Sequence, residues 1–353
     1  MSASNAGVQA IKDRKRNEFY TPYSAIKDEL ESGIYKSFSG QTVYANCDNP
    51  LKSNFTLYFL QNFAKLGLKR LISTGYNPGG YGYKLDVTEP VTGDITHYIA
   101  THTDRLSGNG DFRSDECLNY LKQADIVVTN PPFTFFRALF DLLIDQKKKF
   151  IILGDHHAAT YNDVLTQIMY GDTKIGKFKK QLEFRVPDDY DLRTGGSIKG
   201  KHKYVKEHVR WYSNVITKWT PRNDTFSVKY DPKLYPKYPN YDIIEVSKMK
   251  DLPVDYNGIM GVPVSFLDFY DPDKFKLLGK SDHSFAKRFI TQPPIRWVLH
   301  RLDGSTATRS DNSPYLRLNK IPKNHTYLTK ADDPNYIIKQ VYQRFFIKWN
   351  RKR

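Results

Sequence analysis

An apolar run that stops at two consecutive prolines constrains this chain more than any other feature. Asp125–Thr129 is short and β-branched, and Asn130-Pro131-Pro132-Phe133 follows it directly. A run of this kind, bounded by a turn signal, is typical of a buried strand in a parallel sheet. Proline keeps the residue before it out of the helical region, so the backbone after the strand is stiff and extended. Sites in open α/β sheets lie at the carboxyl ends of strands, where this tetrapeptide falls.

The tetrapeptide offers the groups that methylation of an exocyclic amine requires. An amine such as adenine N6 is a poor nucleophile, because its lone pair is delocalised into the ring. The Asn130 side-chain oxygen and the Pro131 carbonyl would accept its two hydrogens and stabilise the positive charge that develops on the nitrogen. Phe133 would stack on a base flipped out of its duplex. The structural alternative is a strand that ends in prolines and an asparagine turn.

Length and composition limit the number of domains and the class of protein. At 353 residues the chain has room for two domains, or for one α/β domain with a large appendage. It has no run of about 18 apolar residues, so we expect no transmembrane helix and no membrane partner. Met1–Ala10 lacks the order of a signal peptide. Cys47 and Cys117 have no paired spacing, which argues against a disulfide framework or a cysteine zinc site and favours the cytoplasm.

The formal net charge of +16 is unevenly distributed. Residues 1–173 contain 18 Lys and Arg against 19 Asp and Glu, whereas residues 174–353 contain 36 against 19. The basic excess therefore lies entirely after Asn130–Phe133. Such an excess indicates a region that binds a polyanion, and a solvated basic surface is the alternative.

Helical and strand patterns alternate as far as residue 153. Helices are predicted at Ser24–Leu30 (with Ser24 as N-cap), Asn54–Leu66, Asp115–Lys122 and Phe135–Leu143. Strands are predicted at Thr42–Ala45, Leu68–Ser73, Asp125–Thr129 and Lys149–Leu153, with an irregular hairpin or loop over Gly75–Gly93. The alternation predicts an α/β fold, with a doubly wound, mostly parallel sheet and an appended basic C-terminal region.

The pattern changes after Gly171. Lys177–Val186 and His208–Val215 are predicted to be longer, half-polar strands, joined by the glycine- and lysine-rich segment Gly195–Lys203. That segment suits contact with phosphates, or is a solvated hairpin tip. Lys229–Tyr241 interleaves rings with cations, which fits either nucleic-acid contact or Pro–Tyr packing.

Several further residues are candidates for a site. Asp111 and Phe112 end a glycine-rich turn from which they would reach a cofactor, although Asp111 also suits a turn or cap. Asp48 follows the first strand, where a carboxylate binds ribose hydroxyls or a cation, or forms an Asx turn. His156 and His157 lack neighbours in metal-ligand spacing, so no metal site is predicted. No G-x-G-x-x-G follows the first strand, which argues against a dinucleotide cofactor.

Taken together, these segments resemble the EcoRI-type DNA adenine-N6 methyltransferases, which use S-adenosylmethionine. The resemblance extends from Asn17 to Leu153, is most specific in Gly110–Cys117 and Asp125–Phe133, and returns at Met260–Leu267. The order of the motifs, with the recognition region last, resembles the γ arrangement of amino-methyltransferases. Two departures from the wider pattern are Asn46–Pro50 in place of a glycine-rich turn, and Ser73-Thr74 in place of an acid.

The resemblance implies roles for individual residues. The catalytic motif is matched by Asn130, Pro131, Pro132 and Phe133. The cofactor contacts that it implies come from Tyr20, Thr21, Pro22, Asp48, Asp111, Phe112 and Asn130. Within this set, Tyr20 to Pro22 match the motif that holds the methionine end of S-adenosylmethionine, and Asp111 and Phe112 match the residues at its adenine.

We therefore predict a mobile basic arm at residues 1–16, a methyltransferase domain at 17–217 and a DNA-recognition region at 218–353. The predicted enzyme is a monomer that transfers a methyl group directly from S-adenosylmethionine to adenine N6 in double-stranded DNA. Its biological setting would be protection by methylation in a bacterium or phage, with a cognate restriction endonuclease as a separate partner. The alternatives are methylation of RNA adenine or protein glutamine, or a DNA-binding relative without turnover.

Overall fold

The computed structural model describes residues 19–176, 181–190, 192, 195–218, 221, 226–281, 287–289, 296–310, 313–323 and 325–351. The arm predicted at residues 1–16 lies outside these ranges, as does the beginning of the strand predicted from Lys177. The chain divides into two compact units, Met1–Thr220 and Pro221–Arg353.

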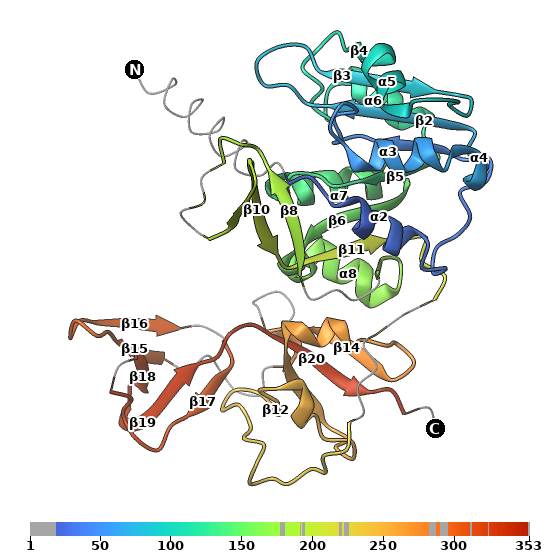
Figure 1. Cartoon of the computed structure of the whole chain (residues 1–353). Helices are drawn as coiled ribbons and strands as arrows, with labels where there is room; N and C mark the ends of the chain where they lie inside the picture. The colour runs from blue at the N-terminus through green and yellow to red at the C-terminus, as the bar shows by residue number, and fades with distance from the viewer. Residues whose placement is uncertain are drawn as a thin grey trace. The chain divides into compact units, whose positions relative to one another are not determined.

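The first unit is built on an eight-stranded sheet with the order β4-β3-β2-β1-β5-β6-β11-β7 (Figure 1). Its four central strands are parallel: β2 (Arg70–Gly75), β1 (Thr42–Ala45), β5 (Ile126–Thr129) and β6 (Lys149–Asp155). The edges are antiparallel additions: β3 (Tyr83–Val87), β4 (Asp104–Arg105), β11 (Val209–Ser213) and β7 (Lys174–Ile175). The α/β prediction is confirmed, but the sheet is parallel only at its centre.

Helices cover both faces of this sheet. The first group comprises α2 (Tyr23–Leu30), α3 (Asn54–Gln61), α4 (Phe63–Leu66) and α5 (Ile95–His102). The second comprises α6 (Asp115–Gln123), α7 (Phe136–Asp145) and α8 (Asn162–Tyr170). Val43 and Ala45 share one apolar core with α2 and α3, whereas Tyr44 between them contacts Tyr120 of α6. Alternate residues of one strand thus face opposite helical layers, as in a doubly wound fold.

Two predicted helices differ in detail from the observed ones. Helix α2 begins at Tyr23 with Pro22 as its N-cap, and no side chain caps it, so the prediction of Ser24 as N-cap is wrong. The helix predicted over Asn54–Leu66 divides into α3 and α4, and Asn62 between them donates from Nδ2 to the Tyr58 carbonyl at 2.8 Å. Side-chain hydrogen bonds of Asn to the local backbone compete with helix continuation.

A small antiparallel sheet, β8 (Leu182–Val186), β10 (His202–Glu207) and β9 (Ser197–Lys199), stands beside the large sheet (Figure 1). Leu182, Phe184, Val186 and Val205 join the same apolar core as α2 and α3. The Tyr20 N–H also donates to the Arg185 carbonyl at 2.9 Å. The segment Gly195–Lys203 is therefore a hairpin on a buried base.

The second unit, where described, contains strands and short 3-10 turns. One sheet has the order β12-β13-β20-β14, from Ile243–Glu245, Ile259–Pro263, Arg344–Trp349 and Phe275–Lys280. The other has the order β16-β15-β18-β19-β17, from Thr306–Ser310, Arg296–His300, Tyr327–Lys330, Asp333–Gln340 and Tyr315–Arg317. This explains why the sequence shows no helical period there.

An ion pair between Glu245 and Arg344 lies in the interior of the second unit. The two side chains are 2% and 11% exposed, and the guanidinium donates to both carboxylate oxygens at 2.8–3.2 Å. Tyr238 donates to the same carboxylate. Multiple charge-assisted bonds compensate the desolvation of the pair.

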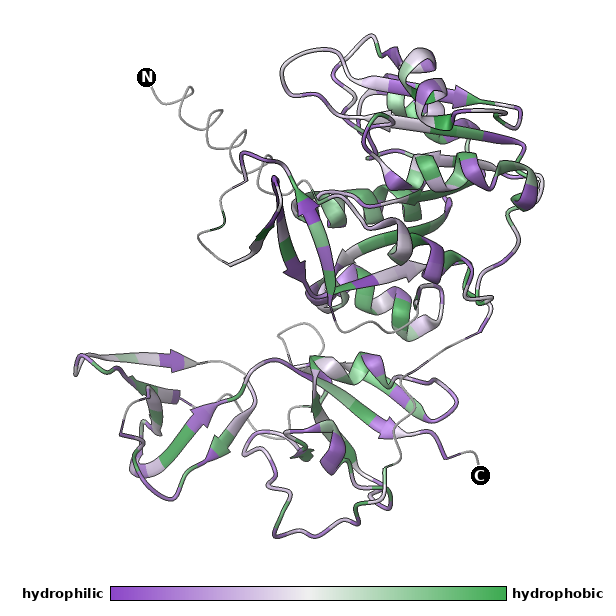
Figure 2. Ribbon diagram, in the orientation of Figure 1, coloured by the Kyte–Doolittle hydropathy of each residue, from purple (hydrophilic) through white to green (hydrophobic). Residues whose placement is uncertain are grey.

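The central strands of the first unit are strongly apolar, as Figure 2 shows. All four residues of β1 and all four of β5 are buried. Within the described ranges, every helix is too short or too polar to cross a bilayer.

Gly154 in β6 gives a test of this packing. A Cβ at residue 154 would lie 2.3 Å from the Phe136 ring, which itself packs on Tyr212 at 5.0 Å between centroids. We expect Gly154→Ala to lower the free energy of unfolding by about 1–3 kcal/mol through overpacking. Gly79→Ala, at a turn with nothing closer than 3.9 Å, is the control and should change it by less than about 0.5 kcal/mol. Urea unfolding of both variants measures the difference, and equal values would contradict the packing.

Candidate active site

The carboxyl ends of β1, β2 and β5 meet at two adjoining hollows. The first is lined by Asn46, Cys47, Asn49, Tyr76, Pro78, Gly110, Asp111, Phe112, Arg113, Pro132 and Phe135. The second is lined by Phe19, Tyr20, Thr21, Cys47, Asp48, Asn49, Lys52, Ser53, Asn54, Phe55, Asn130 and Pro132. Cys47, Asn49 and Pro132 belong to both. The predicted residues Tyr20, Thr21, Asp48, Asp111, Phe112, Asn130 and Pro132 are thus brought together, although they span more than a hundred positions of the sequence.

Asn130 is held with its amide oriented. It is 9% exposed, and its Nδ2 donates to the Phe19 carbonyl at 2.8 Å. Its Oδ1 is buried and has no hydrogen-bond partner among the described residues. Unsatisfied buried acceptors are rare and call for an explanation. A ligand that donates to this oxygen would supply one.

The rest of the tetrapeptide turns sharply. Pro131 is buried, and the Pro132 carbonyl accepts the Phe135 N–H at 2.8 Å, which opens a 3-10 turn over Phe133–Phe135 before α7. The Pro131 carbonyl accepts no hydrogen bond from any described residue. The Phe133 ring stacks on Phe19, with centroids 5.0 Å apart and planes at 22°. One face of the ring is therefore already covered.

Asp48 is the centre of a hydrogen-bond network at this edge of the sheet. Its Oδ2 accepts the Thr129 hydroxyl at 2.5 Å and its Oδ1 accepts the Ser53 hydroxyl at 2.9 Å. The backbone N–H of Asn130 also bonds to this carboxylate. Asp48 therefore links the end of β1 with the end of β5 and with Ser53, the N-cap of α3.

Burial dominates the ionisation of Asp48. It raises the pKa of the carboxyl from 3.8 to about 6, against the opposite effect of the hydrogen bonds from Thr129, Ser53 and the Asn130 backbone. Desolvation disfavours the charged form of an acid, whereas hydrogen bonds to a carboxylate favour it.

The end of β2 is shaped for close contact rather than for charge. Ser73 donates to the Asp48 carbonyl at 2.7 Å, and the Thr74 carbonyl accepts the Asp48 N–H at 3.0 Å. A Cβ on Gly75 would lie 2.4 Å from the Asn49 Cα, and one on Gly110 (φ +79°) would lie 2.4 Å from the Gly75 carbonyl oxygen. The turns after β1 and before α6 thus touch the same strand end. The residues Ser73, Thr74 and Gly75 therefore end β2 with two hydroxyls and a glycine, where the wider methyltransferase pattern has an acid.

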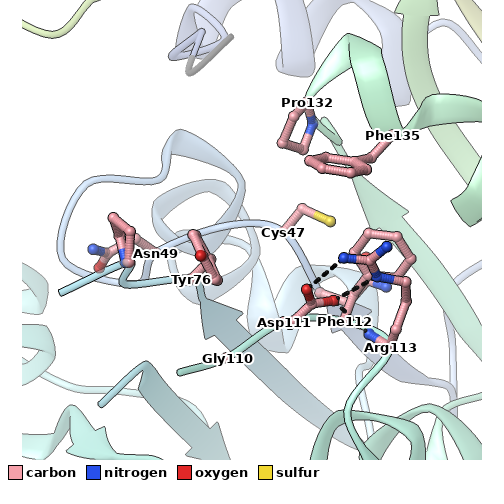
Figure 3. A pocket seen from close by; sticks show the side chains of 11 residues that line it. Cys47, Asn49, Tyr76, Gly110, Asp111, Phe112, Arg113, Pro132 and Phe135 are labelled. Carbon is pink, nitrogen blue, oxygen red and sulfur yellow. Dashed lines mark hydrogen bonds and ion pairs between the residues drawn. The ribbon is translucent and has the colours of Figure 1, made fainter. Parts of the chain in front are cut away.

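Arg113 lines the first hollow together with the aromatic residues Phe112 and Phe135 (Figure 3). Arg113 donates to both Asp111 oxygens, from Nε at 2.9 Å and from NH2 at 2.6 Å. Its guanidinium carbon lies 5.5 Å from the Phe112 ring centre and 5.1 Å from that of Phe135. Phe112 itself is buried at 7% exposure. Arg113 therefore fixes the Asp111 carboxylate at the wall of the hollow.

Of the three residues predicted at the methionine end of S-adenosylmethionine, two line a hollow and one does not. Tyr20 and Thr21 line the second hollow, and Thr21 Oγ1 is buried without a partner among the described residues. The Tyr20 hydroxyl lies 3.5 Å from Lys52 Nζ. The Pro22 carbonyl accepts the N–H groups of Ala25 and Ile26, so Pro22 starts α2 and does not line either hollow.

The cysteines are kept neutral. Burial, followed by the nearby Asp48 charge, raises the pKa of the Cys47 thiol well above 9, and burial raises that of Cys117 as well. A thiol needs its thiolate form to act as a nucleophile. Cys47 therefore contributes shape to the hollows rather than covalent chemistry.

His156 and His157 have an acidic neighbour that the sequence analysis overlooked. Atoms of Asp155, His156 and His157 that suit metal binding lie within 4.8 Å of one another. Asp155 Oδ1, however, accepts the His157 N–H at 2.7 Å and so caps the turn at His156–Thr160. The local turn accounts for this cluster.

Sequence reasoning missed several residues of the site. Asn46, whose buried Oδ1 has no partner among the described residues, lines the first hollow together with Tyr76, Arg113 and Phe135. Of these residues, only Arg113 could have been predicted from the sequence. It lies inside the Gly110–Cys117 block, and an Arg two positions after an Asp is well placed to form an ion pair with it. The others become neighbours only through the fold.

A parallel-centred sheet with Asn-Pro-Pro-Phe at a strand end and two adjoining hollows defines the class: an α/β methyltransferase. A family model described as "Adenine-specific methyltransferase EcoRI" matches residues 7–350, and the chain belongs to this family. The match includes both units, well beyond the segments in which the sequence resemblance was seen. The chain is accordingly a DNA adenine methyltransferase.

Individual relatives agree with this family. The chain is 37% identical over 295 residues to the Type II methyltransferase M.EcoRI of Escherichia coli, which covers 78% of this chain and 90% of the relative. It is 37% identical over 283 residues to the Type II methyltransferase M.MgeORF184P of Mycoplasma genitalium. It is 34% identical over 286 residues to the Type II methyltransferase M.MpnI of Mycoplasma pneumoniae, and 86% of each Mycoplasma relative is covered.

The raised pKa of Asp48 predicts a pH-dependent stability. Because its folded pKa lies above its unfolded value, its contribution is full below about pH 3.8 and is lost as the pH rises through about 6. Between pH 4 and pH 7 the unaltered chain should lose about 2.4 kcal/mol relative to Asp48→Asn, somewhat less than the full effect of a shift of about two pKa units because an unfolded Asp is already partly ionised at pH 4. Urea unfolding at several pH values measures this difference. Asp145→Asn, at an exposed position, is the control; a difference for Asp48→Asn that does not change with pH would contradict the prediction.

Proposed function

We propose that the two hollows bind S-adenosylmethionine and the target adenine. Three buried oxygens without partners among the described residues line them: Thr21 Oγ1, Asn46 Oδ1 and Asn130 Oδ1. Acceptors of this kind suit the ammonium and ribose hydroxyls of the cofactor and the amine of the base. Tyr20 and Thr21 would hold the methionine end, and Asp111 and Phe112 the adenine end. S-adenosylmethionine supplies an electrophilic methyl group on a sulfonium.

The observation that carries this proposal is the free Oδ1 of Asn130. Nδ2 donates to the Phe19 carbonyl, which orients the amide and leaves the buried Oδ1 as an acceptor without a partner among the described residues. Asn130 Oδ1 and the Pro131 carbonyl would each accept one hydrogen of the N6 amine. The two bonds localise the lone pair on nitrogen and stabilise the positive charge that appears as the new C–N bond forms. The amine proton is lost to solvent after transfer.

Transfer is direct, without a covalent enzyme intermediate. The neutral Cys47 thiol is the one cysteine at the hollows, and its raised pKa keeps it from acting as a nucleophile. Phe133 would meet the flipped base with the ring face that Phe19 does not cover.

Asp48 would act as a positioning residue rather than as a cofactor ligand. Its carboxylate oxygens already accept the Ser53 and Thr129 hydroxyls and the Asn130 N–H. Each of these bonds fixes a part of the chain that carries or adjoins Asn130. Holding catalytic groups within a few tenths of an ångström is worth orders of magnitude in rate.

Double-stranded DNA is the substrate that the charge supports. The second unit would read the sequence, while the first performs the chemistry. Site-specific methylation by a monomer, alongside a separate restriction endonuclease, fits relatives that are named Type II methyltransferases. This setting is a bacterial or phage-infected cell.

Asn130→Ala tests the catalytic role. Removing the acceptor should lower kcat about a hundredfold to a thousandfold, while the Kd for S-adenosylmethionine changes less than about threefold, because the oxygen acts on the amine. Tritium transfer to duplex DNA and calorimetry measure the two quantities. Asn119→Ala, on the exposed face of α6, is the control. Turnover that survives Asn130→Ala would exclude this mechanism.

Asp48→Asn separates positioning from cofactor binding. The substitution replaces one carboxylate oxygen, an acceptor, by an NH2 group, a donor. Since the groups around residue 48 all donate to it, the Asn130 backbone N–H should lose its acceptor. We expect kcat to fall about tenfold to a hundredfold with little change in the Kd for S-adenosylmethionine. A large rise in that Kd with kcat unchanged would assign Asp48 to the cofactor instead.

A further inference from the structure

The small sheet β8-β10-β9 is attached directly to the catalytic turn. The Phe184 ring of β8 meets the Phe133 ring edge-on at 6.4 Å and the Phe19 ring at 5.5 Å. The bond from the Tyr20 N–H to the Arg185 carbonyl ties β8 to the segment that also holds Asn130. The sheet is therefore in direct contact with the turn that carries Phe133 and with the segment that holds Asn130.

The register of the sheet gives it two unlike faces. On β8, Leu182, Phe184 and Val186 are buried in the core, so Glu183 and Arg185 point the other way. Tyr204 is paired with Arg185, Lys206 with Glu183, and His202 with Lys199. We call the side chains of Arg185, Lys199, Tyr204 and Lys206, together with Lys201 at the turn, the basic face.

The basic face is exposed and rich in cations. Arg185, Lys199, Lys201 and Lys206 are all exposed, and Tyr204 is half-buried. Residues 197–206 contain four lysines and no acid. Lys199 pairs with Glu183 and lies 5.2 Å from the Tyr204 ring centre, whereas Lys201 and Lys206 form no ion pair with a described residue.

A hollow opens between this sheet and the glycines that precede β9. Its lining includes two lysines and two acids, and consists of Glu183, Tyr190, Gly195, Gly196, Ser197, Lys199, Tyr204, Val205, Lys206 and Glu207. Gly195 and Gly196 have φ of +116° and +148°, and a Cβ on Gly196 would lie 2.7 Å from the Tyr204 carbonyl. The chain can pass this close to Tyr204 only with glycine there.

We propose that the basic face binds the phosphate backbone of duplex DNA next to the target adenine. The inference rests on the proposed function and adds a second DNA contact, in the catalytic unit itself. Lysines on a rigid strand pair provide point charges at fixed spacing, which position a duplex without reading its sequence. The apolar inner face transmits that position to Phe133 through Phe184. An aromatic ring beside the cations adds stacking or packing to the sugar–phosphate chain.

The test is a triple variant, Lys199→Gln, Lys201→Gln and Lys206→Gln. The matched control is Lys36→Gln, Lys69→Gln and Lys149→Gln, three exposed lysines near the amino ends of the central strands, at the opposite edge of the sheet. Binding of unmethylated duplex fragments is measured at several salt concentrations. Loss of three phosphate contacts should reduce the slope of log K against log salt by about 2.7 and weaken binding roughly tenfold to a hundredfold near 0.15 M salt. The control should keep the slope of the unaltered protein.

Further measurements keep the outcome clear. The Kd for S-adenosylmethionine and the melting temperature should stay unchanged in the triple variant, and replacing the same lysines by Arg should restore DNA binding. A slope equal to that of the control would overturn the proposal, as would tighter binding of duplex RNA than of duplex DNA by the unaltered protein. Failure of the proposed function is distinct, since the unaltered protein would then methylate no DNA at all.

Discussion

The site depends on one buried carboxylate. Asp48 bonds to the Thr129 hydroxyl at the end of β5, to the Asn130 N–H one residue later, and to the Ser53 hydroxyl that caps α3. Asp48 and Thr129 are 81 positions apart in the sequence, so only the fold brings these two parts of the chain together. A charged acceptor with several donors ties them more firmly than a neutral one would, since charge-assisted bonds are the strong ones. The network therefore sets where the Asn130 amide points before any ligand arrives.

Close backbone contacts at two glycines also position the loops of the site. Gly75 lets the turn at Asn49 touch the end of β2, and Gly110 lets the turn before Asp111 touch the same strand from the other side. A methyl group at either position would meet backbone atoms at 2.4 Å. Two loops thus converge on the end of β2. Arg113, which packs on the Phe112 and Phe135 rings, holds the Asp111 carboxylate by two hydrogen bonds.

The sequence predicted the parts of this site that are encoded locally. A β-branched run before Asn130-Pro131-Pro132 is both a strand signal and a chemical signal, so β5 and its amide were found together. Residues that join through tertiary contact were not: Asn46, Phe135 and Phe19 carry no local pattern that distinguishes them from core or turn residues. The antiparallel edge strands were missed for a similar reason. The apolar pattern of a strand such as β11 indicates that it is buried, but not whether it runs parallel or antiparallel to its neighbour. The Ser24 cap failed because Pro22 already begins α2.

The distribution of unsatisfied atoms explains why such a site persists. A buried acceptor without a donor costs about 1–3 kcal/mol, and Thr21, Asn46 and Asn130 each leave one at the hollows. An ionised Asp48 adds a further cost near neutral pH, because its folded pKa is raised. The apolar strands of β1 and β5 offset these losses, since every residue in them is buried. A fold selected for stability alone would fill these positions with apolar side chains. Here three buried oxygens at the hollows stay unpaired among the described residues, and a bound molecule that donates hydrogen bonds would satisfy them.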